Sequence, residues 1–100
     1  MIVESRVDAV FCAAHKDRRD GTLHGHSYQV SAWFPFTGGD ATMLREYLVD
    51  ELRPLDHGEL PEQLTWAEDI ASYLLGVLPN CTRVRVSRPL EGLHAEARKA

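Results

Sequence analysis

The sequence has few of the features that mark secreted or membrane-bound proteins. Its only two cysteines, Cys12 and Cys81, can form at most one disulfide, so we expect free thiols rather than a secreted disulfide framework. No apolar stretch approaches the ~20 residues that cross a bilayer, and the N-terminal segment carries acidic residues where a signal peptide would be apolar. These absences predict a cytoplasmic protein without a membrane partner.

Positive charge is also scarce. Eleven basic residues face 15 acidic ones, the formal net charge is −4, and no basic run is longer than Arg18-Arg19, so nucleic acid is not an expected partner. The hydrophobic share of 44% and the charged share of 26% are those of a globular protein. We therefore expect one domain over residues 1–100, small enough to gain burial by associating with further copies.

Four segments have the composition or alternation of strands. Residues 2–14 and 24–36 are rich in β-branched and aromatic side chains and predict an antiparallel hairpin, with a turn at 37–40 closing the second strand. Residues 82–87 alternate cleanly, with Val84 and Val86 facing inward, and residues 92–98 form a weaker fourth candidate. The segment 55–64 contains Gly58 and Pro61 without either periodicity and is expected to be a loop.

Two helices are predicted between these strands. The first follows Asp40, a capping residue for its free amides, and ends before Pro54. The second begins near a possible capping box of Thr65 and Glu68 and ends before Pro79. The resulting fold class is α+β, with a four-stranded antiparallel sheet covered by two helices on one face.

Three of the five histidines gather around the predicted hairpin. His24 and His26 are two residues apart on a strand and therefore project to the same side, and the hairpin can return His15 beside them. Three histidines that leave a fourth position open are typical of catalytic zinc. The alternative is that they are unrelated polar residues near a loop, since short motifs of this kind also occur by chance.

Several motifs in order resemble one family. They are FCAAH at 11–15, LHGHSY at 23–28, MLREY at 43–47, LDH at 55–57 and WAEDIA at 66–71. Together they resemble the 6-pyruvoyltetrahydropterin synthase and 6-carboxytetrahydropterin synthase family. The resemblance implies the tunnelling fold, a barrel-forming oligomer and a cytoplasmic carbon-oxygen lyase that acts on 7,8-dihydroneopterin triphosphate or a related pterin. It further implies zinc on His15, His24 and His26, proton transfer by Asp56 and His57, and a role that fits deazapurine (queuosine) biosynthesis better than tetrahydrobiopterin synthesis.

The sequence departs from that family at two chemically important positions. Where the family has a catalytic cysteine, four residues before HGH, this chain has Asp20, which is either a substitute base or a turn residue. Cys12 is a poor substitute, because in a regular strand it faces away from His15, and we expect it in the core.

The second departure concerns pterin recognition. The family's pterin-binding glutamate corresponds to the stretch of Ser87 and Arg88, and Glu91 can replace it only if the loop folds back. Glu68 matches an acidic family position and is a second substrate-binding candidate, although a capping role explains it equally well. The loop after His15 and the link before Asp56 are also short for the family.

These departures leave three hypotheses open. The first is a zinc-dependent pterin lyase, and the second is a divergent member that binds a pterin or purine-like ligand without the family reaction. The third is a structural oligomer whose histidines only pack. A sheet with one uncovered face favours a homohexamer, a dimer of trimers with sites at subunit boundaries, or else a smaller oligomer.

Overall fold

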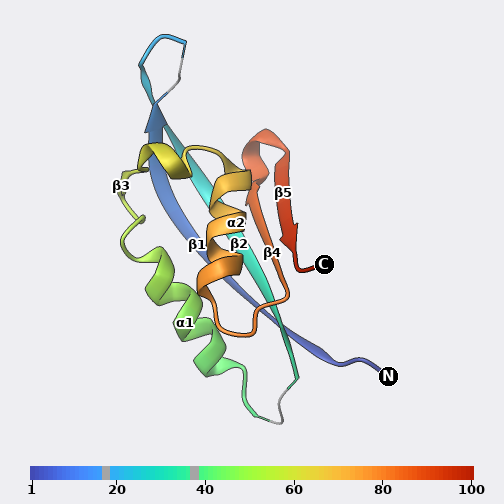
Figure 1. Cartoon of the computed structure of the whole chain (residues 1–100). Helices are drawn as coiled ribbons and strands as arrows, with labels where there is room; N and C mark the ends of the chain where they lie inside the picture. The colour runs from blue at the N-terminus through green and yellow to red at the C-terminus, as the bar shows by residue number, and fades with distance from the viewer. Residues whose placement is uncertain (17–18, 37–38) are drawn as a thin grey trace.

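The sheet is built on a long hairpin and carries both helices on one face (Figure 1). The computed structural model describes residues 1–16, 19–36 and 39–100. Its strands are β1 (Glu4–Lys16), β2 (Leu23–Pro35), β3 (Gly58–Glu59), β4 (Arg83–Arg88) and β5 (Leu93–Arg98). They lie in the order β3-β1-β2-β4-β5, and all neighbours are antiparallel except the short β3, which runs parallel to β1. The α+β architecture is thus confirmed, with β3 added to the four predicted strands.

The β1–β2 register decides which side chains share a face. Phe11 lies opposite Tyr28, and their rings stack with centroids 4.7 Å apart. Alternate residues of the two strands point toward the helices, because successive side chains of a strand leave opposite faces. The buried members of this face are Val7, Ala9, Phe11, Ala13, Tyr28, Val30, Ala32 and Phe34, joined by Val84 and Val86 of β4.

Helices α1 (Thr42–Leu52) and α2 (Ala67–Val77) cover this face. Asp40 accepts hydrogen bonds from the backbone amide and the hydroxyl of Thr42 at the start of α1, as predicted. The predicted capping box of α2 is wrong. The Thr65 hydroxyl turns back to the Glu62 carbonyl instead, and Asp69 accepts the Trp66 amide.

The connections differ from expectation in two places. The predicted loop at 55–64 holds β3 and a short 3-10 helix, η1 (Glu62–Leu64). The weak fourth strand pairs along its full length with β4, from Arg83 opposite Arg98 to Arg88 opposite Leu93, so the edge is longer than its sequence indicated. Part of the predicted turn at 37–40 lies outside the described residues. Within them, no helix is long and apolar enough to cross a membrane.

The face of the sheet away from the helices is polar and carries the exposed cysteine. Cys12 lies on this face, so the prediction of a core thiol is wrong, whereas Cys81 is fully buried. On the same face Arg83 lies 4.1 Å from the ring of Trp33 and donates to Glu96 at 2.8 Å. Arg85 and Arg98 also donate to Glu96. This network lowers the pKa of Glu96 from 4.5 to about 2, chiefly through the hydrogen bond from Arg83.

Candidate metal centre and adjoining groove

The hairpin brings the three predicted histidines to one end of the helix-covered face. His15 lies directly opposite His24, and His26 lies opposite Ala13, the next pair on that face. The ring centroids of His15 and His26 are 4.8 Å apart, and those of His15 and His24 are 6.2 Å apart. The hairpin therefore brings His15 beside His24 and His26, as their spacing in the sequence predicts.

Two of these rings converge on a common point. The Nε2 atoms of His15 and His26 are 2.9 Å apart, close to the about 3.3 Å that separates two nitrogens on a tetrahedral zinc with bonds of 2.0–2.1 Å. Glu91 binds the other nitrogen of His26, with Oε1 2.8 Å from Nδ1. A carboxylate behind a histidine is the usual arrangement for a metal ligand, since it fixes the ring orientation and leaves the far nitrogen available.

The surroundings of His15 favour the neutral form that metal binding requires. It is only 6% exposed, and its Nδ1 atom is buried without a partner of hydrogen-bonding geometry in the described ranges. Burial lowers the pKa of His15, the positive charges of His26 and Arg88 act in the same direction, and the nearby Thr65 backbone opposes them. A buried neutral imidazole presents a lone pair, which is what a metal cation needs.

His24 is turned differently from the other two. Its Nε2 atom is 2.9 Å from the Thr22 hydroxyl, which itself donates to Asp20 at 2.7 Å. Among the described residues, no three His, Cys, Asp or Glu side chains already surround one metal position. Two converging histidines with a carboxylate behind one of them fit a metal, and His24 is an exposed residue on the same face of the hairpin.

Asp20 is a turn residue in its local contacts. Its Oδ1 atom accepts both the backbone amide and the hydroxyl of Thr22. These are the bonds of an Asx turn, so the contacts agree with the second interpretation from the sequence, that Asp20 is a turn residue. Thr22, which connects Asp20 to His24, is a neighbour that sequence reasoning missed, although the spacing Asp-x-Thr is a signal for it.

Asp56 and His57 form the predicted pair at the sheet edge. The carboxylate Oδ2 of Asp56 lies 3.0 Å from Nδ1 of His57, and Oδ1 accepts the Cys12 amide at 3.0 Å. The His57 amide donates to the Cys12 carbonyl at 2.6 Å. His57 has a φ of 60°, which non-glycine residues seldom adopt and which recurs at functional sites. The hydrogen bond from Cys12, followed by that with His57, lowers the pKa of Asp56 and keeps it ionised.

One groove of about 590 Å³ is lined by His26, Glu91 and His57. His15, His24 and Asp56 are not among the described residues that line it. The exposed thiol of Cys12, 3.6 Å from the Ser27 hydroxyl, lines the same groove. Residues that the sequence separates by up to 79 positions, from Cys12 to Glu91, therefore line a common space of ligand size.

Comparisons with known proteins agree with this architecture. No family model matches the sequence, and no curated protein matches it either. Among solved structures, 6-pyruvoyl tetrahydropterin synthase of Caenorhabditis elegans is similar with a TM-score of 0.78 and 16% identity, covering 100% of this chain and 97% of that chain. A catalytic-residue mutant of Plasmodium vivax 6-pyruvoyltetrahydropterin synthase is similar with a TM-score of 0.70 and 18% identity, covering 99% and 98%.

The chain has the fold of the 6-pyruvoyltetrahydropterin synthases. At this low sequence identity, the similarity shows only that the sheet and helices are arranged alike, because proteins of one fold can carry out many different reactions. The chemistry has to be argued from the side chains of this chain.

Glu68, the other predicted substrate-binding residue, lies outside the large groove. It borders a second cavity of about 150 Å³ between the start of α2 and the β4–β5 turn, together with Arg88 and His94. Ser87 is not among the described residues that line this cavity, and its Oγ lies 2.8 Å from Nδ1 of His94. Glu91 does fold back, because the 3-10 turn η2 (Pro89–Glu91) ends at Gly92 with a φ of 69°, but it contacts His26.

Proposed function

We propose that the protein is a zinc-dependent lyase acting on 7,8-dihydroneopterin triphosphate or a related pterin. The observation that carries the proposal is the convergence of the His15 and His26 Nε2 atoms at 2.9 Å, with Glu91 behind His26 and His57 across the same groove. Zinc held by His15, His24 and His26 would supply a Lewis acid for a substrate hydroxyl. The pterin class comes from the shared fold and the motif resemblance.

Besides holding zinc, the chain has to transfer a proton and to orient the group that transfers it. The reaction removes a proton from a side-chain carbon beside a hydroxyl, and the electron pair left behind expels triphosphate as the carbon–oxygen bond breaks. His57 is suited to carry that proton because an imidazole ring can both accept and donate a proton. The Asp56 carboxylate accepts a hydrogen bond from the Cys12 amide and lies 3.0 Å from Nδ1 of His57, so it orients the His57 ring.

A second function is favoured by two observations. Asp20 is engaged in a turn with Thr22, and the motif resemblance puts Ser87 and Arg88 in the stretch where the family has a pterin-binding glutamate. A guanidinium only donates hydrogen bonds and cannot accept those of a pterin amino edge. The alternative is therefore a divergent member of this fold that binds a pterin or purine-like ligand without the family reaction.

Turnover and binding assays separate the two functions. The zinc-loaded protein is incubated with 7,8-dihydroneopterin triphosphate, and released triphosphate is measured. The lyase proposal expects release that His24→Ala abolishes and that Glu59→Gln, a change on the groove wall, leaves intact. Release no greater than that of His24→Ala contradicts it. Calorimetric binding of a pterin or purine without release supports the alternative, and no binding to any of them contradicts the alternative too.

Assembly belongs to the same proposal. The uncovered sheet face and the open edges of β3 and β5 fit closure with further copies into a homohexamer of two trimers in the cytoplasm. Light scattering tests this, and a monomeric mass at micromolar concentration contradicts it.

A further inference from the structure

The outer side of the helical layer carries an apolar patch that the proposed lyase chemistry does not use. Its members are Met43 and Tyr47 of α1 and Tyr73 and Val77 of α2, and each residue is at least 39% exposed. The members of each pair are four positions apart, so each pair lies on one side of its helix. We call these four residues the helix-layer patch.

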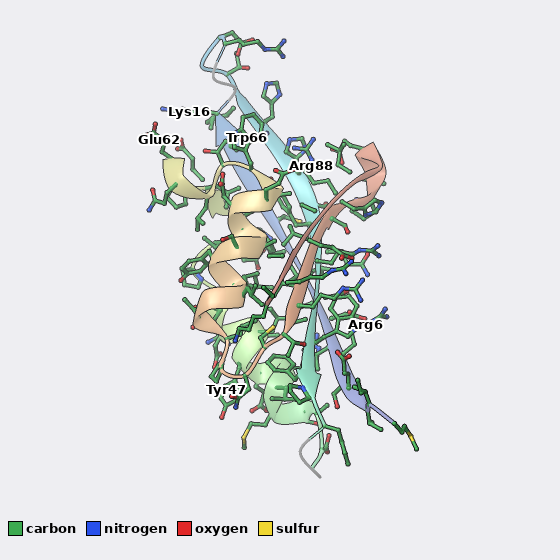
Figure 2. All side chains as sticks on the ribbon, turned by 45° about the vertical axis from the view of Figure 1, so that its right-hand side comes forward. Arg6, Lys16, Tyr47, Glu62, Trp66 and Arg88 are labelled. Atoms are coloured by element: carbon green, nitrogen blue, oxygen red, sulfur yellow. The ribbon has the colours of Figure 1, made fainter. Side chains whose placement is uncertain are left out.

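A contact between the two helices brings the pairs together. The Tyr73 hydroxyl donates a hydrogen bond to Oε2 of Glu51 at 3.4 Å. Because α1 and α2 run in opposite directions (Figure 1), one turn back along α1 leads from this contact to Tyr47, and one turn forward along α2 leads to Val77. Figure 2 shows Tyr47 at the end of the layer where α2 finishes. The two pairs therefore belong to one continuous surface.

The segment that contains the patch is strongly acidic. Residues 42–77 hold two of the 11 basic residues and eight of the 15 acidic ones, so their formal charge is −6, whereas the rest of the chain carries +2. Both basic residues of this segment are engaged. Arg45 donates to the Asp8 carbonyl at 3.0 Å, and Arg53 pairs with Asp50 at 3.0 Å. The helical layer thus combines exposed apolar side chains with an excess of negative charge.

This negative charge decides what kind of partner fits the patch. Glu46, which is exposed, and Glu51 lie on either side of Tyr47 in α1. In a symmetric contact between two copies the same surfaces meet, so these carboxylates would approach their own equivalents and repel. An anionic membrane surface would be repelled in the same way. The complementary partner has basic residues around apolar ones.

We infer that the helix-layer patch docks a basic amphipathic helix of another protein. Such a helix carries apolar side chains at positions i, i+3, i+4 and i+7 and can lay them on the patch while its lysines or arginines meet Glu46 and Glu51. Aromatic residues and methionine, which make up three of the four patch residues, are enriched at protein interfaces. None of the four is among the described residues that line the large groove, so the inference does not depend on the proposed lyase function.

The test compares three synthetic helical peptides of about 15 residues, or about four helical turns. The first has leucine on one face and lysine on the other, and the second has glutamate in place of the lysines. The third has the composition of the first with its leucines spread around the helix. Calorimetry measures the affinity for the full chain, and NMR shifts of the Met43 and Val77 methyl groups locate the site. We expect saturable binding of the first peptide that weakens as salt is raised, with the other two at least about tenfold weaker.

Matched variants separate the patch from general charge attraction. Tyr47→Ser and Val77→Ser should each weaken binding of the first peptide at least about fivefold, because they remove apolar contacts. Glu46→Gln should weaken it about twofold, as expected for one exposed charge. Val10→Ser is the control, because Val10 is 76% exposed on the face of the sheet away from the helices, and it should leave the affinity unchanged.

Three results would overturn the inference. They are no saturable binding of the first peptide, equal binding of the first and third peptides, and NMR shifts located away from the patch. A lower mass of the free protein in light scattering after Tyr47→Ser or Val77→Ser would show instead that another copy covers the patch, and the inference would be wrong. The assay uses neither zinc nor a pterin, so its failure is distinguishable from failure of the lyase proposal.

Discussion

Replacing Glu91 with glutamine should weaken zinc binding without unfolding the chain. The carboxylate lies 2.8 Å from His26 Nδ1, and the hydrogen bond from His26 is the main cause of the lowered pKa of Glu91. Mutating such a carboxylate behind a metal-binding histidine usually costs 10–100-fold in metal affinity, about 1.4–2.7 kcal/mol. The Glu91 side chain is 37% exposed, and glutamine keeps an acceptor oxygen, so we expect the lower end, about tenfold.

The assay is competition for zinc between the protein and a chelating dye. Glu59→Gln is the matched control, because Glu59 borders the same groove but pairs with Lys16 and not with a histidine. Its zinc affinity should equal that of the parent protein. Equal affinities for Glu91→Gln and Glu59→Gln would refute the reasoning that Glu91 orients a metal ligand.

Three further predictions concern stability, thiol access and proton transfer. The pKa of Glu96, lowered to about 2, converts to about 3 kcal/mol of stability, which partial exposure reduces to about 2. A carboxyl group whose pKa is depressed in the folded state stabilises the fold at pH values above its ordinary pKa. Glu96→Gln should therefore lower the free energy of unfolding at pH 7. Chemical denaturation should show that the difference in unfolding free energy between the two proteins disappears as the pH falls from 4.5 to about 2. Iodoacetamide should label Cys12 in the native protein and Cys81 only after unfolding, as mass spectrometry can check; native labelling of Cys81 would contradict its burial. Asp56→Asn should reduce triphosphate release by about 10²-fold with zinc content unchanged, and undiminished release would remove the pair from the reaction.

Strand and helix positions could be read from the sequence because their periodicity is strong. The two hairpin strands, the helix ends before Pro54 and Pro79, and the shared face of His24 and His26 follow from alternation and proline chemistry. Residues 92–98 have little β-branched content, and their full pairing with β4 is a tertiary effect that local propensity does not report.

The predictions that failed concern residues whose contacts join distant segments, or residues for which several local hydrogen bonds are possible. Alternation correctly turned Cys12 away from His15, but whether that face is covered depends on where the helices pack. At the start of α2, the sequence indicates that Thr65 forms the capping hydrogen bond. In the structure the Thr65 hydroxyl donates to the Glu62 carbonyl, and Asp69 accepts the Trp66 amide. The contact of Glu91 with His26 spans 65 positions and needs the tight turn at Gly92.

The most direct test of the proposed metal centre is a crystal structure of the zinc-loaded protein with anomalous data at the zinc edge. The account predicts one peak per chain, about 2.0–2.1 Å from a nitrogen of each of His15, His24 and His26, with His24 rotated away from Thr22. No peak at this end of the hairpin, or a peak with His24 still against the Thr22 hydroxyl, would contradict it.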